Sequence, residues 1–212
     1  MRQHSLLWLI LMALALLFSP LIVTQERFKN CFDEEMLSAL RWYGKAEAFI
    51  VAANGERLYG IIMGDTGVDG MLRTHFVKPE PENLDVAPGV KMPDKLAGAF
   101  KGVLGYWENM MMNIHLLCYR LAHTWTWLLY ILPFTLAIIF DGIMIRKAKI
   151  ASFRYTSPTV YNLSWHAIIG IFAFSLVYFT LTFPISIFYY PITLAVIGVL
   201  MRMVIGNIQH SA

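Results

Sequence analysis

Three residues near the middle of the chain have types that could bind a metal ion: His115, Cys118 and His123. On a helix their spacing does not bring the three side chains to one point, and a structural zinc site usually needs four ligands. The chain also lacks a CxxC or HExxH motif. We therefore expect no metal site, and we expect the two histidines to lie at the edge of a bilayer.

Motifs for catalysis or nucleotide binding are missing from the sequence. It contains no GxxxxGKS or GxxxxGKT phosphate-binding loop, no GxSxG nucleophile elbow and no kinase motif set. No basic stripe with interleaved aromatic residues is present to grip a phosphate backbone. The sequence predicts a protein that is not an enzyme, holds no cofactor and does not bind nucleic acid directly.

The two cysteines, Cys31 and Cys118, could form a disulfide. Cys31 follows the first apolar run, and Cys118 precedes the second. At a helical rise of about 1.5 Å per residue, both would lie at a similar height of roughly 10 Å above a membrane. An oxidising compartment such as a bacterial periplasm would permit the bond. The alternative, which we favour, is that both are small buried side chains.

Asp141 is the only acidic residue in the second apolar run. An acid near the end of a helix opposes the helix dipole, and near hydrocarbon it is poorly solvated, so a nearby cation would stabilise it. Arg202 in the last apolar run could reach it, or Arg146 or Lys147 could fold back. We expect Asp141 and Arg202 to pair and hold two helices together. The alternative is that each extends separately to the lipid headgroups.

Apolar runs long enough to cross a bilayer must position these residues. About 20 apolar residues make one span, so 6–23 and 124–145 predict one span each and 164–206 predicts a hairpin of two. The prolines place the hairpin break at 183–184 or across 185–191. Residues 6–23 lack a small-x-small cleavage site, which favours an uncleaved anchor. The predicted fold class is an all-α integral membrane protein with a bundle of four transmembrane helices.

Basic residues set the predicted orientation. Four of them follow the second span: Arg146, Lys147, Lys149 and Arg154. Short loops rich in lysine and arginine stay in the cytoplasm, so residues 146–163 are predicted to be a cytoplasmic basic loop. Residues 1–5 and 207–212 are then also cytoplasmic, and 24–123 is extracytoplasmic. The net charge of +3 therefore reflects topology rather than nucleic-acid binding.

The outer segment, 24–123, has helical patterns separated by a proline-rich connection. Residues 33–43 have apolar side chains at helical spacing, and Asp33 could cap that helix. Prolines and glycine break the pattern across 78–94. Residues 96–123 are predicted to form a helix that continues into the second span. The segment therefore reads as two helical arms, rather than an independent globular domain.

The stretch 133–166 resembles a family of membrane proteins of unknown function from integrating conjugative elements and conjugative plasmids. The resemblance lies in an Asp-Gly pair, a basic turn and a polar segment that opens the next helix: Asp141-Gly142, Arg146, Ser157, Tyr161 and His166-Ala167. Lys147 and Lys149 stand where the family usually has an acid and further arginines. The resemblance covers mainly residues 124–206.

This resemblance implies a multi-pass component of the bacterial inner membrane. Its expected role is to assemble or stabilise a conjugative DNA-transfer apparatus, of the type IV secretion and coupling class. The expected partners are membrane lipids, other membrane subunits such as a type IV coupling protein ATPase, and further copies of the chain. The family offers no catalytic residues. A small transporter subunit or an entry-exclusion membrane protein is the alternative function.

Overall fold

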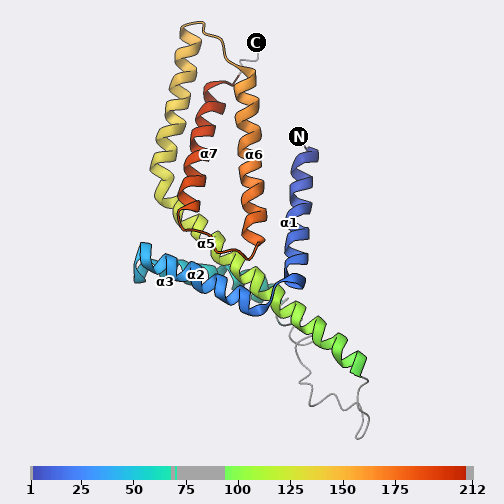
Figure 1. Ribbon diagram of the computed structural model, residues 1–212. Helices are drawn as coiled ribbons and strands as arrows, with labels where there is room; N and C mark the ends of the chain where they lie inside the picture. The colour runs from blue at the N-terminus through green and yellow to red at the C-terminus, as the bar shows by residue number, and fades with distance from the viewer. Residues whose placement is uncertain (1, 68–69, 71–93, 209–212) are drawn as a thin grey trace. The chain divides into compact units, whose positions relative to one another are not determined.

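The computed structural model describes residues 2–67, 70 and 94–208. The described part of the chain folds into helices and contains no strand (Figure 1). In chain order the elements are α1 (Arg2–Ile22), α2 (Gln25–Tyr43), α3 (Lys45–Tyr59), the short π-helix η1 (Gly60–Asp65), α5 (Asp94–Ala151), α6 (Pro158–Thr180) and α7 (Tyr189–Gly206). The predicted proline-rich connection lies, except for Asp94, outside the described residues.

The elements form two compact units. The hairpin unit comprises Met1–Met12, His123–Tyr178 and Ile185–Ala212. The acidic unit comprises Ala13–Ala122 and Phe179–Pro184, and it contains every acidic residue of the chain except Asp141. The end of α6 and the first part of the connection after it, Phe179–Pro184, thus belong to the acidic unit, although most of α6 and all of α7 belong to the hairpin unit.

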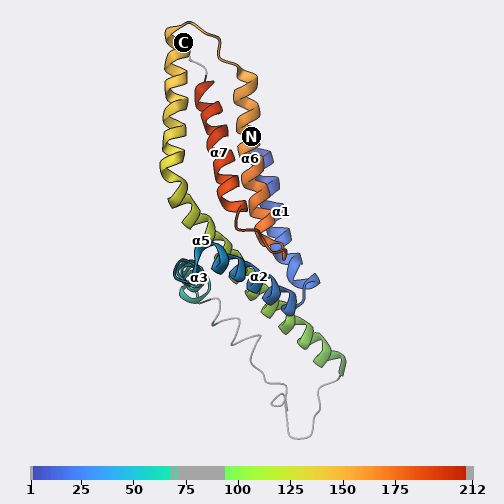
Figure 2. The same cartoon turned by 60° about the vertical axis from the view of Figure 1, so that its left-hand side comes forward.

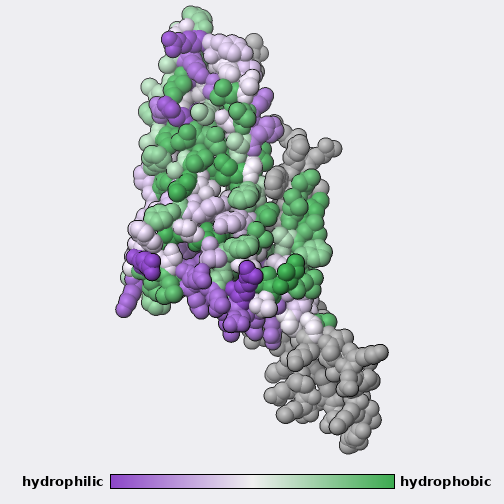
Figure 3. Space-filling view, in the orientation of Figure 1, coloured by the Kyte–Doolittle hydropathy of each residue, from purple (hydrophilic) through white to green (hydrophobic). Residues whose placement is uncertain are grey.

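Three helices are long and apolar enough to cross a membrane: Gly105–Ala151 within α5, α6 and α7. Within the hairpin unit, the C-terminal part of α5 runs beside α6 and α7 (Figures 1 and 2). Hydrophobic side chains gather over the middle of these helices (Figure 3). In α1, a shorter apolar stretch, Ala13–Ile22, lies among the residues that the structure describes fully. The described residues thus contain three candidate membrane-spanning helices, and the four-span count stays a prediction.

The connection between α5 and α6 is shorter than the sequence predicts. Helix α5 continues to Ala151, so the connection to α6 is only 152–157 rather than 146–163. The cations Arg146, Lys147 and Lys149 are therefore on the helix and not in a loop. Between α6 and α7 the helical structure is broken across 181–188, which contains the predicted break at Phe183 and Pro184.

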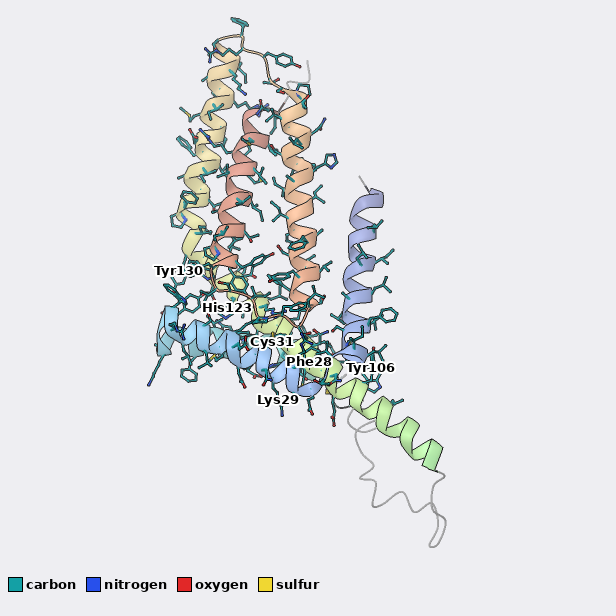
Figure 4. The ribbon with its side chains drawn as sticks, in the orientation of Figure 1. Phe28, Lys29, Cys31, Tyr106, His123 and Tyr130 are labelled. Atoms are coloured by element: carbon teal, nitrogen blue, oxygen red, sulfur yellow. The ribbon has the colours of Figure 1, made fainter. Side chains whose placement is uncertain are left out.

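In the acidic unit, α2 and α3 are packed against the N-terminal part of α5. Buried Phe28 and Cys31 of α2 contact Leu116 of α5, and buried Val51 of α3 packs with Tyr119 of α5. Figure 4 shows Phe28 and Cys31 where α2 meets α5. Apolar side chains on one face of each helix thus build this core.

Two glycines allow this packing. Gly44 separates α2 from α3 and has φ of 80°, in the left-handed region that glycine adopts without a steric penalty. Gly55 faces Tyr119, and a Cβ at position 55 would lie 2.9 Å from the Tyr119 Cα atom. Helices α3 and α5 therefore approach backbone to backbone at Gly55.

The start of α2 also differs from the prediction. The helix begins at Gln25, so Asp33 lies inside it and does not cap it. Thr24 occupies the N-cap position without a side-chain hydrogen bond to the backbone. The predicted second arm is present from Asp94 onward, and it continues into the apolar part of α5 without interruption.

Candidate functional site

A buried arginine is the centre of the acidic unit. The Arg120 side chain on α5 is fully buried, and the Glu35 side chain on α2 is 3 % exposed. The Nε atom of Arg120 donates to the two Glu35 oxygens at 3.1 and 3.3 Å, and an Nη2 hydrogen bond reaches Glu35 Oε1 at 2.6 Å. This is the bidentate geometry in which a guanidinium binds a carboxylate most specifically.

The remaining guanidinium hydrogens bind main-chain oxygens at the end of α6 and in the connection that follows it. Nη1 donates to the carbonyls of Phe179 at 2.7 Å and Leu181 at 2.6 Å, and Nη2 donates to the carbonyl of Phe183 at 2.7 Å. An arginine has five N–H donors, and each has an acceptor here. We call Arg120, Glu35 and these three carbonyls the arginine clamp. It joins α2, α5 and the connection in one polar core.

Cys31 completes the surroundings of the clamp. Its Sγ atom lies 3.3 Å from Arg120 Nη2, and its thiol donates to Glu35 Oε1 at 3.7 Å, one helical turn away. Burial, with a smaller contribution from the Glu35 charge, raises the pKa of the Cys31 thiol to about 12. Cys31 is therefore a protonated, unreactive thiol at neutral pH.

Polar side chains along α5 bind the end of α1 at helical spacing. Tyr106 donates to the Leu17 carbonyl at 3.1 Å, and Asn109 donates to the carbonyls of Pro20 and Val23 at 3.1 and 3.0 Å. Pro20 lies in the last turn of α1, where main-chain oxygens lack partners within the helix. Asn113, one turn further, donates to Ser19 Oγ at 2.5 Å. The three α5 residues thus hold the C-terminal turns of α1.

A groove lies on the acidic unit between α2, α3 and α5, with a volume of about 580 Å³. His115 lines it, and its Nε2 atom lies 2.7 Å from Glu56 Oε1. The His115 ring packs between two aromatic rings, those of Phe32 and Tyr59, with centroid distances of 5.4 and 5.3 Å. The groove therefore has a fixed wall of rings and an accessible charged edge.

In the hairpin unit, the structure brings Asp141 and Arg202 together. Arg202 Nε donates to the Asp141 carboxylate, and both side chains are about half exposed. Gly142 makes the approach possible, because a Cβ there would lie 3.2 Å from the Arg202 Cα atom. Helices α5 and α7 are therefore closely packed where this ion pair forms.

The other predicted cations have different surroundings. Lys149 donates to the Gly206 carbonyl at 3.1 Å and to Asn207 Oδ1 at 2.8 Å, so it binds the C-terminal end of α7. Arg146 is partly buried, whereas Lys147 and Arg154 are exposed. Lys149 thus has a structural contact, and Lys147 and Arg154 remain accessible to a partner or to lipid.

The Asp141–Arg202 pair can be tested by charge reversal. Asp141→Arg or Arg202→Asp alone should lower the unfolding temperature by about 2–4 °C, the shift that corresponds to about 1 kcal/mol in a chain of this size. The double reversal should recover most of that loss. The measurement is thermal unfolding of the detergent-solubilised protein, with Lys147→Glu as an exposed control. A double variant no more stable than the singles would contradict a stabilising pair.

The disulfide that we considered is not formed. Cys31 and Cys118 are free and buried, and Cys31 is in contact with the arginine clamp. Both cysteines match the alternative of small buried side chains. Among the residues that the structure describes, no three histidine, cysteine or acidic side chains are grouped to hold a metal ion. His123 is buried and stacks on Tyr190 at a centroid distance of 5.2 Å.

Sequence reasoning missed Arg120 and Glu35, although one signal was present. Between Glu108 and Asp141 the sequence contains no lysine, aspartate or glutamate, and its one arginine is Arg120. A lone charge in such a long uncharged stretch requires a partner or access to water. Glu35 gave no comparable signal, because it follows Asp33 and Glu34 in an acidic run that resembles a solvated helix face.

Comparison with known proteins gives a family. The model of the family described as IncC plasmid conjugative DNA transfer protein DtrJ-like matches residues 33–209. No curated protein matches the chain, and no solved structure does. The match covers Glu35, Arg120 and the connection after α6, as well as Asp141 and Arg202. The chain therefore belongs to the DtrJ-like family of conjugative DNA transfer proteins.

Proposed function

We propose that the protein is a non-enzymatic, multi-pass component of the bacterial inner membrane that assembles or stabilises the conjugative DNA-transfer apparatus. The observation that carries the assembly role is the arginine clamp. Its buried charges are bound to each other and to main-chain carbonyls, so they stabilise one arrangement of helices and are not directed at a substrate. Membership of a family of conjugative DNA transfer proteins supports the proposed role in conjugation.

The proposed topology has four spans, with α1 as the first. In this arrangement the acidic unit lies mainly on the extracytoplasmic side, and both termini and the connection 152–157 are cytoplasmic. The exposed cations Lys147 and Arg154 support this orientation through the excess of lysine and arginine in cytoplasmic loops. They would contact anionic headgroups or cytosolic machinery, and a type IV coupling protein ATPase is a candidate partner.

Reporter fusions test the topology. Green fluorescent protein inserted after Phe153, which is 97 % exposed, should fluoresce, because this reporter matures in the cytoplasm. Alkaline phosphatase inserted after Gly67 should be active, because that enzyme requires the periplasm. Exchanging the two reporters between these positions provides the control. Alkaline phosphatase activity after Phe153 would reverse the proposed orientation.

Deletion of the gene tests the function. An in-frame deletion in donor cells should lower the transfer frequency by at least tenfold, and the intact gene supplied in trans should restore it. A second measurement tests for entry exclusion: unmodified donors are mated with recipients that carry the gene, and the transfer frequency is compared with that into recipients that lack it. Unchanged transfer from deleted donors, together with reduced entry into recipients that express the protein, would favour an entry-exclusion function instead.

A further inference from the structure

The groove of the acidic unit has an apolar interior and an acidic edge. Its interior includes buried Phe28 and Leu116 and the partly buried Met111 and Met112. Methionine side chains are flexible and polarizable, and they are frequent on surfaces that accept helices of varied sequence. An accessible groove of about 580 Å³ with this lining is suited to apolar side chains from another molecule.

The edge of the groove has an excess of negative charge. The carboxylates of Asp33, Glu56 and Glu108 line it and are exposed, and among the described residues of the lining Lys29 is the only lysine or arginine. Exposed carboxylates around an apolar interior favour a ligand that places positive charge beside apolar groups. An anionic headgroup or a phosphate would be repelled by the same edge.

We propose that this groove binds an amphipathic helix of another membrane subunit, whose apolar face is flanked by lysine or arginine. An accessible groove lined by residues of three helices fits the helix-in-groove mode of recognition. The proposal rests on the proposed function, because it assumes assembly with other subunits on the extracytoplasmic side. A second copy of the chain carries cations on the same unit, Arg41 and Lys45 among them, but they flank the mainly polar helix α2 rather than an apolar helix face.

The binding measurement uses the full chain in nanodiscs of zwitterionic lipid and a fluorescent synthetic helix of leucine and lysine. The peptide should bind the protein-containing discs well above empty discs, and an equivalent leucine–glutamate helix should not. Asp33→Asn combined with Glu56→Gln should weaken binding about fivefold to tenfold, because pairs between exposed charges contribute modestly to affinity. Glu34→Gln, an exposed neighbour outside the groove, should leave binding unchanged.

A second pair of variants tests the apolar interior. Met111→Trp should fill the groove and reduce peptide binding, whereas Met110→Trp, at an adjacent position outside the lining, should not. Equal effects of the groove and control variants would overturn the proposal. Arg73, Lys78 and Lys91 are basic residues of the same chain. If the peptide binds only after these three are changed to glutamate, the segment that carries them competes for the groove, and the proposal is overturned.

Mating assays separate this inference from the proposed function. If deletion of the gene lowers transfer, the proposed role stands whether or not the groove is used. If Met111→Trp lowers transfer while Met110→Trp does not, and both proteins accumulate normally, the groove is required for assembly. Two results together would reject the groove as a binding site: Met111→Trp donors transfer DNA at the normal frequency, and the peptide does not bind the unmodified protein. The proposed role in transfer would still stand.

Discussion

Replacing Arg120 with alanine should lower the free energy of unfolding by about 3–5 kcal/mol, the usual effect of breaking a buried ion pair from one side. The loss has two sources: Glu35 is left as a buried unpaired charge, and three main-chain carbonyls lose their donors. Thermal unfolding and the amount of protein in membranes would both report it. Arg41→Ala, on the exposed face of α2, is the control and should change stability little.

Two further variants distinguish the arginine clamp from an ordinary ion pair. Exchanging the charges, with Arg120→Glu and Glu35→Arg together, should not restore stability, because a carboxylate at position 120 cannot donate to carbonyls. Arg120→Lys should restore it only in part, since an ammonium has three donors and lacks the planar fork of a guanidinium. Full recovery by the charge exchange would show that the three carbonyl contacts contribute nothing.

Gly55→Ala should destabilise the acidic unit by about 1–3 kcal/mol, which is the usual cost of an overpacked core. The new Cβ would lie 2.9 Å from the Tyr119 Cα atom, so main-chain atoms of α3 or α5 must move. Tyr119 precedes Arg120, so the movement would also disturb the arginine clamp. The measurement is thermal unfolding of the purified protein together with its accumulation in membranes.

The matched control is Gly60→Ala. A Cβ at position 60 meets nothing within 4 Å, and the φ of Gly60 is −57°, so alanine fits without strain. Because alanine favours helical structure more than glycine does, this variant should be neutral or slightly more stable. If both variants behaved alike, helix propensity rather than the contact with Tyr119 would decide the outcome at Gly55.

The sequence was sufficient to predict features that repeat over many residues. Long apolar runs gave the helical fold class, and the residues at 141–142 and 146 led to the conjugative transfer family that the family model then confirmed. Asp141 and Arg202 could be paired in advance because membrane-spanning helices restrict residues to a common depth. The structure shows these two side chains in contact.

The arginine clamp could not be predicted in the same way. Arg120 and Glu35 are 85 residues apart in the chain, and no periodic pattern relates them. The other acceptors are main-chain carbonyls, which every residue has, so Phe179, Leu181 and Phe183 carry no signal in their side chains. The contact of Gly55 with Tyr119 depends on the position of α3 against α5, which no local preference determines.

The arginine clamp also constrains the order of events during biosynthesis. Arg120 leaves the ribosome well before the carbonyls of Phe179, Leu181 and Phe183, which are 59 to 63 residues later in the chain. Until residues 179–183 are synthesised, three guanidinium donors lack the carbonyls that bind them in the folded protein. The acidic unit therefore reaches its final form only after residues 179–183 have been delivered. Nascent or truncated chains that lack them would keep the Arg120–Glu35 ion pair but would present three unsatisfied guanidinium donors to cellular quality control.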